Sequence, residues 1–265
     1  DVYKRQVYYI SSYAELVAAG KIEAGCPIDV CVPTGNFGNI LAAWYAKQIG
    51  APIERLLCAS NDNRVLTDFI NTGTYDISDR EFILTSSPSM DILVSSNLER
   101  LLYLLSGDDK LIADLMKQLS ENGEYEVPAD MLEKLHELFW AGFCDDEGAK
   151  TAIGKVWKDD HYLCDTHTAV AWDVAQQYKQ ANPEHNAVVV LSTASPYKFP
   201  AAVLEGIGEK AEGDEFDVME QLHKVTGVPV PKNLADLRSR AVRHRDVIDR
   251  GEMLDYVLGK AAAEK

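Results

Sequence analysis

The sequence lacks the cysteine spacing and the long apolar run that would indicate a metal site, a redox pair or a membrane helix. Its five cysteines include no CxxC pair. No apolar run approaches the ~18 residues that span a bilayer. Cys31, Cys58 and Cys164 lie within apolar segments, which indicates reduced core residues of a cytosolic protein. We therefore expect no metal site, no membrane contact and a cytoplasmic location.

Positive charge is also scarce. The chain has 26 Lys and Arg against 42 Asp and Glu, which gives a net charge of −16. A surface this acidic repels a phosphate backbone, so we expect no nucleic-acid partner, although local donors can still hold a single phosphate. At 265 residues, 46% of them hydrophobic, the chain can bury a substantial core.

A short loop with two glycines is the feature around which the sequence is organised. Ile28–Val32 is apolar and β-branched, typical of a buried parallel strand, and Ile40–Ile49 predicts a helix that stops at Gly50. A strand, a tight loop and a helix in this order point several backbone N–H groups and the positive end of the helix dipole at one spot. The sequence therefore predicts a phosphate site here.

Each residue of this loop suggests a local role. Gly35 and Gly38 allow close backbone approach and positive φ angles. Asn36 and Asn39 are candidates for capping the helix and for side-chain donors. The loop has neither the Lys-Ser/Thr pair of a P-loop nor three dinucleotide-type glycines, so from spacing alone a plain strand-to-helix turn remains an equal alternative.

The rest of the chain reads as an α/β protein with a helical interruption. Residues 1–86 predict alternating elements, among them a strand at Leu56–Ala59 and a helix at Val65–Asn71. Residues 87–147 predict a helical segment without strands: Met90–Leu105, Lys110–Leu119 and Ala129–Trp140. Residues 148–265 predict a return of the α/β domain and C-terminal helices. The α/β part has predicted helices at Lys150–Trp157 and Thr166–Gln180, a short strand at His161–Cys164 and a buried strand at Ala187–Leu191. The C-terminal helices are predicted at Phe216–Lys224 and through most of Asn233–Lys260.

Five ordered blocks carry a family resemblance. The string Pro33–Asn39 resembles the cofactor-phosphate loop of threonine synthases, which are enzymes that depend on pyridoxal 5′-phosphate (PLP). The other blocks that match in order are Ala59–Asn63 with Leu66–Phe69, Ser87–Arg100, Asp165–Val170 and Ser192–Phe199. The resemblance implies fold type II, a parallel twisted sheet flanked by helices with a helical insertion, and PLP as cofactor.

The resemblance also implies a reaction. Threonine synthases are lyases of threonine biosynthesis that convert O-phospho-L-homoserine and water to L-threonine and phosphate by γ-elimination and β-hydration. Two alternatives stay open. One is a serine/threonine dehydratase or a cysteine-synthase-like enzyme of the same fold, and the other is a non-catalytic homologue that binds a phosphate ligand.

Site residues follow from the matched positions. The resemblance assigns the cofactor to Gly35, Asn36, Phe37, Gly38, Asn39 and Thr193, the last facing the pyridine nitrogen. Thr193 could instead cap the following helix. His167 could transfer protons or be a helix-start histidine satisfied by backbone. Candidates for substrate contact, which turn and cap chemistry explain equally well, are Asn61, Asn63, Ser87 and Ser89.

The main departure from the family pattern concerns lysine. The resemblance implies a Schiff-base lysine, followed by aspartate, well before the glycine loop. Only Lys4 and Lys21 precede the loop here, and neither has that context, while Lys198 matches a structural position. We therefore expect this chain to be a C-terminal portion without the catalytic lysine, inactive alone, with Asp1–Gln6 as a join. The sequence does not indicate an oligomeric state.

Overall fold

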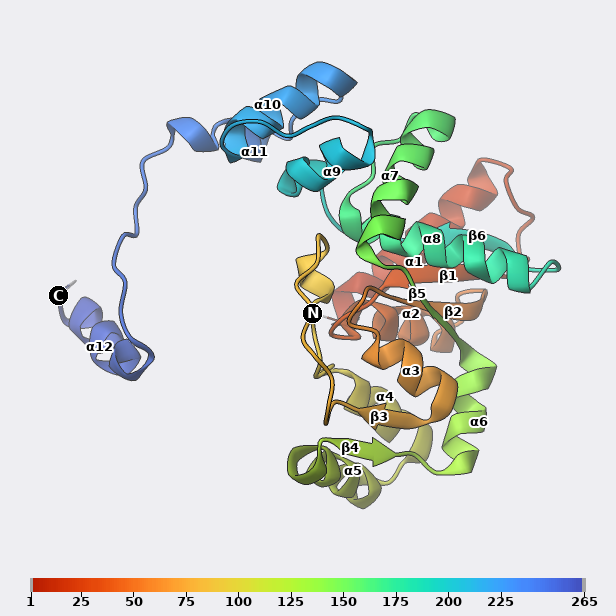
Figure 1. Ribbon diagram of the computed structural model, residues 1–265. Helices are drawn as coiled ribbons and strands as arrows, with labels where there is room; N and C mark the ends of the chain where they lie inside the picture. The colour runs from red at the N-terminus through yellow and green to blue at the C-terminus, as the bar shows by residue number, and fades with distance from the viewer. Residues whose placement is uncertain (1, 264–265) are drawn as a thin grey trace. The chain divides into compact units, whose positions relative to one another are not determined.

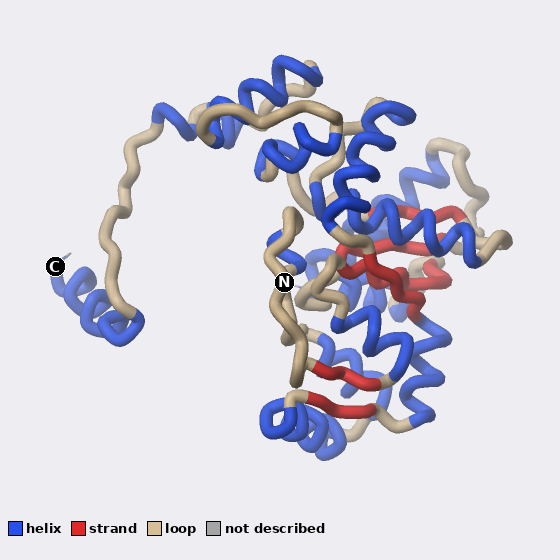
Figure 2. Tube along the Cα trace, viewed as in Figure 1, coloured by secondary structure: helices blue, strands red, loops and turns tan. Residues whose placement is uncertain are grey.

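A four-stranded parallel sheet forms the centre of the larger of two compact units (Figure 1). The computed structural model describes residues 2–263, divided into one unit up to Pro229 and one from Val230. The strands run in the order β5–β2–β1–β6 and lie side by side (Figure 2). Their bounds are β1 (Ile28–Pro33), β2 (Ile53–Ser60), β5 (Phe139–Phe143) and β6 (Ala187–Val190).

Helices cover both faces of this sheet. All six residues of β1 are buried, and alternate side chains point to opposite faces. Val30 and Val32 join the core that α2 (Gly38–Gln48) completes. On the other face, the Cys31 thiol donates to the carbonyl of Ala171 at 3.1 Å, within α8 (Thr166–Ala181). The predicted α/β architecture, a parallel sheet flanked by helices, is confirmed.

The first unit is completed by further helices and a small antiparallel pair, β3 (Thr74–Asp76) with β4 (Glu124–Glu126). The N-terminal half adds α1 (Val2–Ala18), α3 (Val65–Thr72), the 3₁₀ turn η1 (Pro88–Met90), α4 (Leu98–Ser106) and α5 (Asp109–Asn122). The later part adds α6 (Ala129–Leu138), α7 (Asp146–Asp160), η2 (Pro196–Lys198), α9 (Pro200–Gly206) and α10 (Glu215–Thr226).

Within residues 87–147, two helix predictions are wrong in part. A single helix over Met90–Leu105 does not form, because polar side chains of residues 91–97 bond to other segments, and α4 begins only at Leu98. The helix predicted to reach Trp140 ends at Leu138, because Phe139–Phe143 pairs with β2 as the strand β5. The predicted three-part division of the chain stays a prediction.

Two strand predictions near the C-terminal side of the sheet also need correction. His161–Cys164 is irregular: His161 adopts a left-handed conformation (φ 53°) at the end of α7, and the chain turns there. β6 forms as predicted but is not buried. Among the described strands it pairs with β1 alone, so Ala187 is exposed and Val188–Val190 are half-buried at the sheet edge.

The second unit is less helical than predicted. It holds short turns at α11 (Lys232–Ala235), η3 (Leu237–Ser239) and η4 (Arg250–Glu252), followed by α12 (Met253–Ala263). Residues 240–249 form no regular element, in place of the helix expected there.

Two expectations from composition can be compared with the structure. Cys31, Cys58 and Cys164 are buried and free of disulfides, as their apolar surroundings predicted. Among residues 2–263 no helix combines the length and the apolarity that crossing a bilayer requires.

A buried aspartate ties the starts of three strands together. Asp29 on β1 is fully buried and accepts four hydrogen bonds. They come from the amide of Arg55 on β2 (3.0 Å), the hydroxyl of Tyr178 on α8 (3.0 Å), and the amide and side chain of Asn186 before β6 (both 3.2 Å). Because these buried and half-buried donors share one acceptor, this carboxylate fixes the sheet register near its N-terminal edge.

We therefore expect Asp29→Ala to lower the free energy of unfolding by roughly 2–4 kcal/mol, because four donor groups lose their acceptor. Urea denaturation followed by circular dichroism measures this difference. The exposed Asp114→Ala on α5 is the control and should change stability by less than about 0.5 kcal/mol. Equal effects of the two substitutions would contradict the proposed role of Asp29.

Candidate functional site

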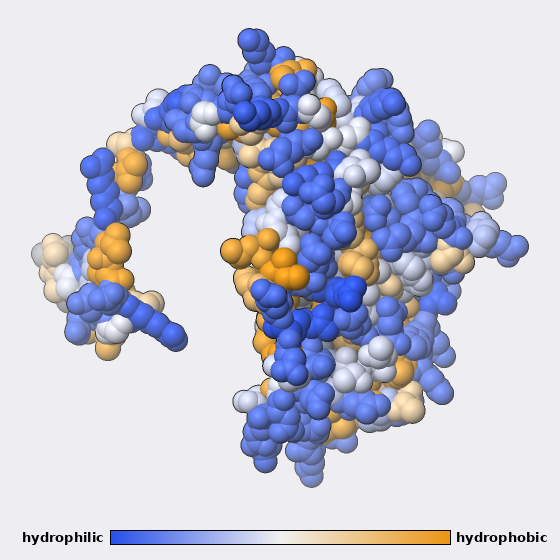
Figure 3. Space-filling model, viewed as in Figure 1, coloured by the Kyte–Doolittle hydropathy of each residue, from blue (hydrophilic) through white to orange (hydrophobic). Residues whose placement is uncertain are grey.

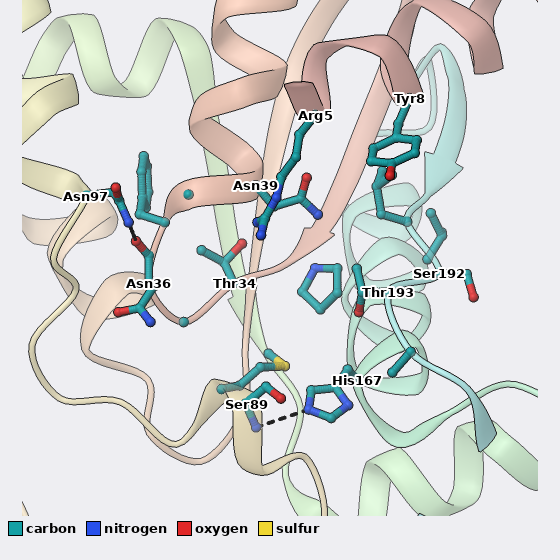
Figure 4. A pocket seen from close by; sticks show the side chains of 18 of the residues that line it. Arg5, Tyr8, Thr34, Asn36, Asn39, Ser89, Asn97, His167, Ser192 and Thr193 are labelled. Atoms are coloured by element: carbon teal, nitrogen blue, oxygen red, sulfur yellow. Dashed lines mark hydrogen bonds between the residues drawn. The ribbon is translucent and has the colours of Figure 1, made fainter. Parts of the chain in front are cut away.

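A cavity of about 1110 Å³ lies at the carboxyl ends of β1 and β6 (Figure 4). The loop after β1, Pro33–Asn39, forms one side, and Val189–Ala194 forms the opposite side. Ser89, Met90 and His167 also line it. In open parallel sheets, ligands bind outside the carboxyl ends of the strands, which is where this cavity lies.

The cavity is electropositive although the chain is strongly acidic. Among the described residues that line it there is no aspartate or glutamate, whereas Arg100 and Lys198 both face it. The whole chain has a net charge of −16, so the carboxylates are concentrated elsewhere. A site with this charge distribution favours an anionic ligand.

The carbonyl groups of the loop are bound by a segment far away in sequence. The Ser95 hydroxyl donates to the Gly35 carbonyl at 2.7 Å. Asn97 donates to the Asn36 carbonyl from its side chain at 2.7 Å, drawn in Figure 4, and from its amide at 3.3 Å. These bonds fix the orientation of the loop peptides.

The N–H groups of the same loop are left without partners. Among the described residues, none accepts a hydrogen bond from the backbone N–H groups of Gly35 to Asn39, which line the cavity at the N-terminus of α2. The side chain of Asn39 adds a donor, because its Oδ1 is already occupied by the Tyr9 hydroxyl at 2.9 Å and its NH₂ group is not. Unused donors at a helix N-terminus are the arrangement that binds phosphate.

The conformation of the loop differs from the sequence-based prediction. Positive φ falls on Phe37 (63°), not on Gly35 or Gly38. Phe37 is also the residue that precedes α2, and neither Asn36 nor Asn39 caps the helix. The ring of Phe37 is buried against Phe139 on β5, with centroids 5.7 Å apart, and this packing offsets the backbone strain.

Gly35 is required for close packing. A Cβ atom at this position would lie 3.0 Å from the Ser89 carbonyl oxygen and from Ile92 Cδ1, and 3.1 Å from the Cα of Met90. At Gly38 the nearest atom would be at an ordinary 3.4 Å. The expectation of close approach is therefore met at Gly35.

Thr193 lies across the cavity from the loop (Figure 4). It follows the end of β6, and no described residue forms a hydrogen bond with its hydroxyl. The alternative that Thr193 caps the next helix does not apply, because Ser195 accepts from the amide of Tyr197 and caps η2. The hydroxyl of Thr193 is therefore available to a ligand in the cavity.

His167 is buried at the cavity wall with both ring nitrogens engaged. Its Nδ1 lies 3.0 Å from Asp165 Oδ1, and its Nε2 accepts from the amide of Ser89 at 3.1 Å (Figure 4). Asp165 also caps α8 by accepting from the amides of His167 and Thr168. A backbone amide satisfies Nε2, as the second of the two readings of His167 expects, whereas the partner of Nδ1 is a side chain. Proton transfer by His167 stays a prediction.

Burial alone would raise the pKa of Asp165, but the hydrogen bonds from His167 and Thr168 outweigh burial and hold that pKa below its usual range. Asp165 is therefore a carboxylate at neutral pH, and several hydrogen-bond donors stabilise its negative charge.

The candidates for substrate contact separate into two groups. Ser89 lines the cavity. Asn61, Asn63 and Ser87 are buried outside its lining. Asn61 Nδ2 and Asn63 Nδ2 both donate to Asp91 Oδ1, at 2.8 and 3.0 Å, so these amides hold a polar network rather than face a ligand. Their substrate role stays a prediction without support from the geometry.

Several site residues were not identified from the sequence. Ser95 and Asn97, which bind the loop carbonyls, lay inside a segment predicted to be helical. Arg100 was given no role and Lys198 was interpreted as structural, yet both line the cavity. Their positive charge in an acidic chain was the available signal. Among residues 2–263 no group of three or more His, Cys, Asp or Glu side chains could hold a metal ion.

Comparison with known proteins identifies relatives of this chain. Residues 168–255 match the family model described as threonine synthase, C-terminal. The chain is 46% identical over 202 residues to threonine synthase-like 1 of Macaca fascicularis, covering 76% of this chain and 27% of that protein. It is 36% identical over 212 residues to threonine synthase of Saccharomyces cerevisiae, covering 74% of this chain and 41% of that protein.

Solved structures agree. PLP-bound threonine synthase from Brucella melitensis superposes with a TM-score of 0.75 at 33% identity, over 91% of this chain and 46% of that one. Threonine synthase from yeast superposes with a TM-score of 0.83 at 27% identity, over 98% of this chain and 52% of that one. The chain is related to the threonine synthases.

The resemblance and the fold type II architecture predicted from the sequence are thereby confirmed. The chain spans between about a quarter and a half of the length of these threonine synthase relatives.

We expect Gly35→Ala to lower the free energy of unfolding by about 1–3 kcal/mol, because the new methyl group collides with backbone atoms of Ser89 and Met90. Gly38→Ala, in the same loop, meets ordinary contact distances and should change stability by less than about 0.5 kcal/mol. Thermal unfolding of both variants checks this. A Gly38→Ala variant as unstable as Gly35→Ala would contradict the assignment of the close contact to Gly35.

Asp165→Asn should destabilise the protein in a pH-dependent way. A carboxylate whose pKa is lowered on folding stabilises the folded state above its unfolded pKa of about 3.9, and this contribution is lost as the pH falls through the lower folded value. We expect a deficit of about 1–3 kcal/mol at pH 7 that shrinks below about pH 4.

Urea denaturation of both proteins between pH 7 and pH 3 measures this deficit. The control is Asp145→Asn, which replaces the exposed aspartate that caps α7. A deficit for Asp165→Asn that stays constant across the range would contradict the lowered pKa.

Proposed function

We propose that this chain forms the PLP-phosphate pocket of a threonine synthase that acts on O-phospho-L-homoserine. The observation that carries the proposal is the row of unused N–H groups at Gly35–Asn39, facing an electropositive cavity at the N-terminus of α2. The PLP-bound relative from Brucella melitensis supports the choice of cofactor.

The residues present fit PLP at both ends of the molecule. The amides of Gly35 to Asn39 would hold its phosphate, and the Asn39 side chain would add a donor. Thr193, on the far side of the cavity, would offer its neutral hydroxyl to the pyridine nitrogen. When bound, PLP supplies an electron sink for negative charge at the substrate α-carbon.

A second phosphate, that of the substrate, fits the charge of the cavity. Arg100 and Lys198 line the cavity, and no carboxylate among its described lining residues offsets their positive charge. Two bound phosphates repel each other, so cations in the wall lower the electrostatic cost of holding both. This supports a phosphorylated substrate over serine, the substrate class of the dehydratase alternative.

The non-catalytic alternative requires less of the site than the proposed enzyme does. A phosphate-binding homologue needs the glycine loop but neither Thr193 nor a Schiff-base lysine. Borohydride reduction of PLP bound to the whole protein in which this chain occurs, followed by peptide mapping, separates these functions. A single labelled lysine supports the enzyme, and the absence of a specific label supports the phosphate-binding homologue.

Binding of PLP to the full chain tests the proposal without requiring turnover. We expect Asn39→Ala to weaken PLP binding by about tenfold, because a donor to the phosphate is lost. Unphosphorylated pyridoxal should bind both proteins equally weakly. Absorbance titrations with the two ligands measure these affinities, and equal binding of PLP and pyridoxal to the unaltered chain would refute the phosphate site.

The substrate is tested on the whole protein in which this chain occurs. We expect release of inorganic phosphate from O-phospho-L-homoserine with equimolar L-threonine. Ammonia release from L-serine in the same assay would instead favour the dehydratase, and no turnover of either substrate by a PLP-loaded protein would favour the non-catalytic homologue.

A further inference from the structure

The segment between β3 and α4 packs against Gly35 and lines the cavity there with Ser89 and Met90, but its middle part has little hydrophobic anchoring. Phe82, Ile83 and Leu84 are 48%, 41% and 84% exposed. They contribute to the apolar patch visible over this loop in Figure 3. Met90 is buried and Leu93 packs against the core, but residues 82–84 give no such anchor, so polar contacts help to hold the segment in place.

Three groups of polar contacts do so. Asp91 accepts from Asn61 and Asn63, which ties the segment to the end of β2. Ser95 and Asn97 bind the loop carbonyls. Between these two points, Nε2 of His167 on α8 accepts a hydrogen bond from the neighbouring amide of Ser89 at 3.1 Å (Figure 4).

The hydrogen bonds of His167 define its protonation state. The Ser89 amide can only donate, so Nε2 must be unprotonated to accept from it. The proton therefore sits on Nδ1 and points to Asp165 Oδ1 at 3.0 Å. The remaining neighbours are the hydroxyl of Thr166, 3.4 Å from Nδ1, and the ring of Phe199, with centroids 4.9 Å apart.

We propose that His167 is a positioning residue: as the neutral Nδ1–H tautomer it holds Ser89 and Met90 against Gly35 and so sets the width of the phosphate pocket. His167 binds the amide of Ser89, and the carbonyl of the same residue packs closely against Gly35. A shift of Ser89 would therefore move the group that packs against the glycine loop. Both nitrogens are occupied, so proton transfer through Nε2 would break the bond to Ser89. In its effect on ligand affinity the inference rests on the proposed phosphate site.

Two variants separate positioning from proton transfer. In His167→Gln the side-chain oxygen lies about as far from the Cα atom as Nε2 of histidine does. It can accept the hydrogen bond from the Ser89 amide, but it cannot titrate. In His167→Asn the shorter amide can still donate to Asp165 and does not reach Ser89. If His167 acts by positioning Ser89, the Gln variant should keep the PLP affinity that the Asn variant loses.

The first measurement is PLP affinity of the full chain. We expect the Gln variant to bind within about threefold of the unaltered protein, and the Asn variant to bind about tenfold more weakly, the loss of one hydrogen bond. Gln as weak as Asn, or Asn as tight as the unaltered chain, would overturn the proposal.

The second measurement needs neither ligand nor variants. Long-range ¹⁵N–¹H NMR of histidine-labelled protein at pH 7.5 should show His167 as the neutral Nδ1–H tautomer. An Nε2–H tautomer or an imidazolium ion would overturn the proposal. If the unaltered chain binds no PLP, the proposed function fails, while the tautomer still decides the role of His167.

Discussion

The site depends on the hydrogen bonds that Ser95 and Asn97 give to the carbonyls of Gly35 and Asn36. A loop peptide can turn either its carbonyl or its N–H group toward a cavity. Because the carbonyls are bound on one side, the N–H groups of the loop face the cavity without a hydrogen-bond partner. The dipole of α2 adds positive potential at the same point. Without these bonds the loop would be an ordinary connection between a strand and a helix.

The sheet supplies the rigidity that this arrangement needs. β1 is buried along its whole length and delivers the loop from its carboxyl end, while Phe37 fastens the loop to β5 through its ring. β6 brings Thr193 to the opposite side from the sheet edge. Anion recognition and hydrophobic packing therefore meet in five consecutive residues, which explains how a left-handed phenylalanine is tolerated there.

Local patterns predicted much of the fold, because β1, β2 and α2 have strong apolar signals and clear stops. The glycine loop was identified for the same reason, and literal resemblance added Thr193. The irregular stretch before α4 could not be predicted, because its side chains bond to residues about 30 to 60 positions away. The exposure of β6 was likewise invisible, since strand composition does not report the place of a strand in the sheet.

The most direct test of the account is amide NMR of the full chain titrated with PLP and, separately, with unphosphorylated pyridoxal. The account predicts that the amide resonances of Gly35 to Asn39 shift strongly with PLP and little with pyridoxal, because these N–H groups bind the phosphate. Unchanged resonances in this loop, with PLP-induced shifts elsewhere, would contradict it and place the ligand at another site.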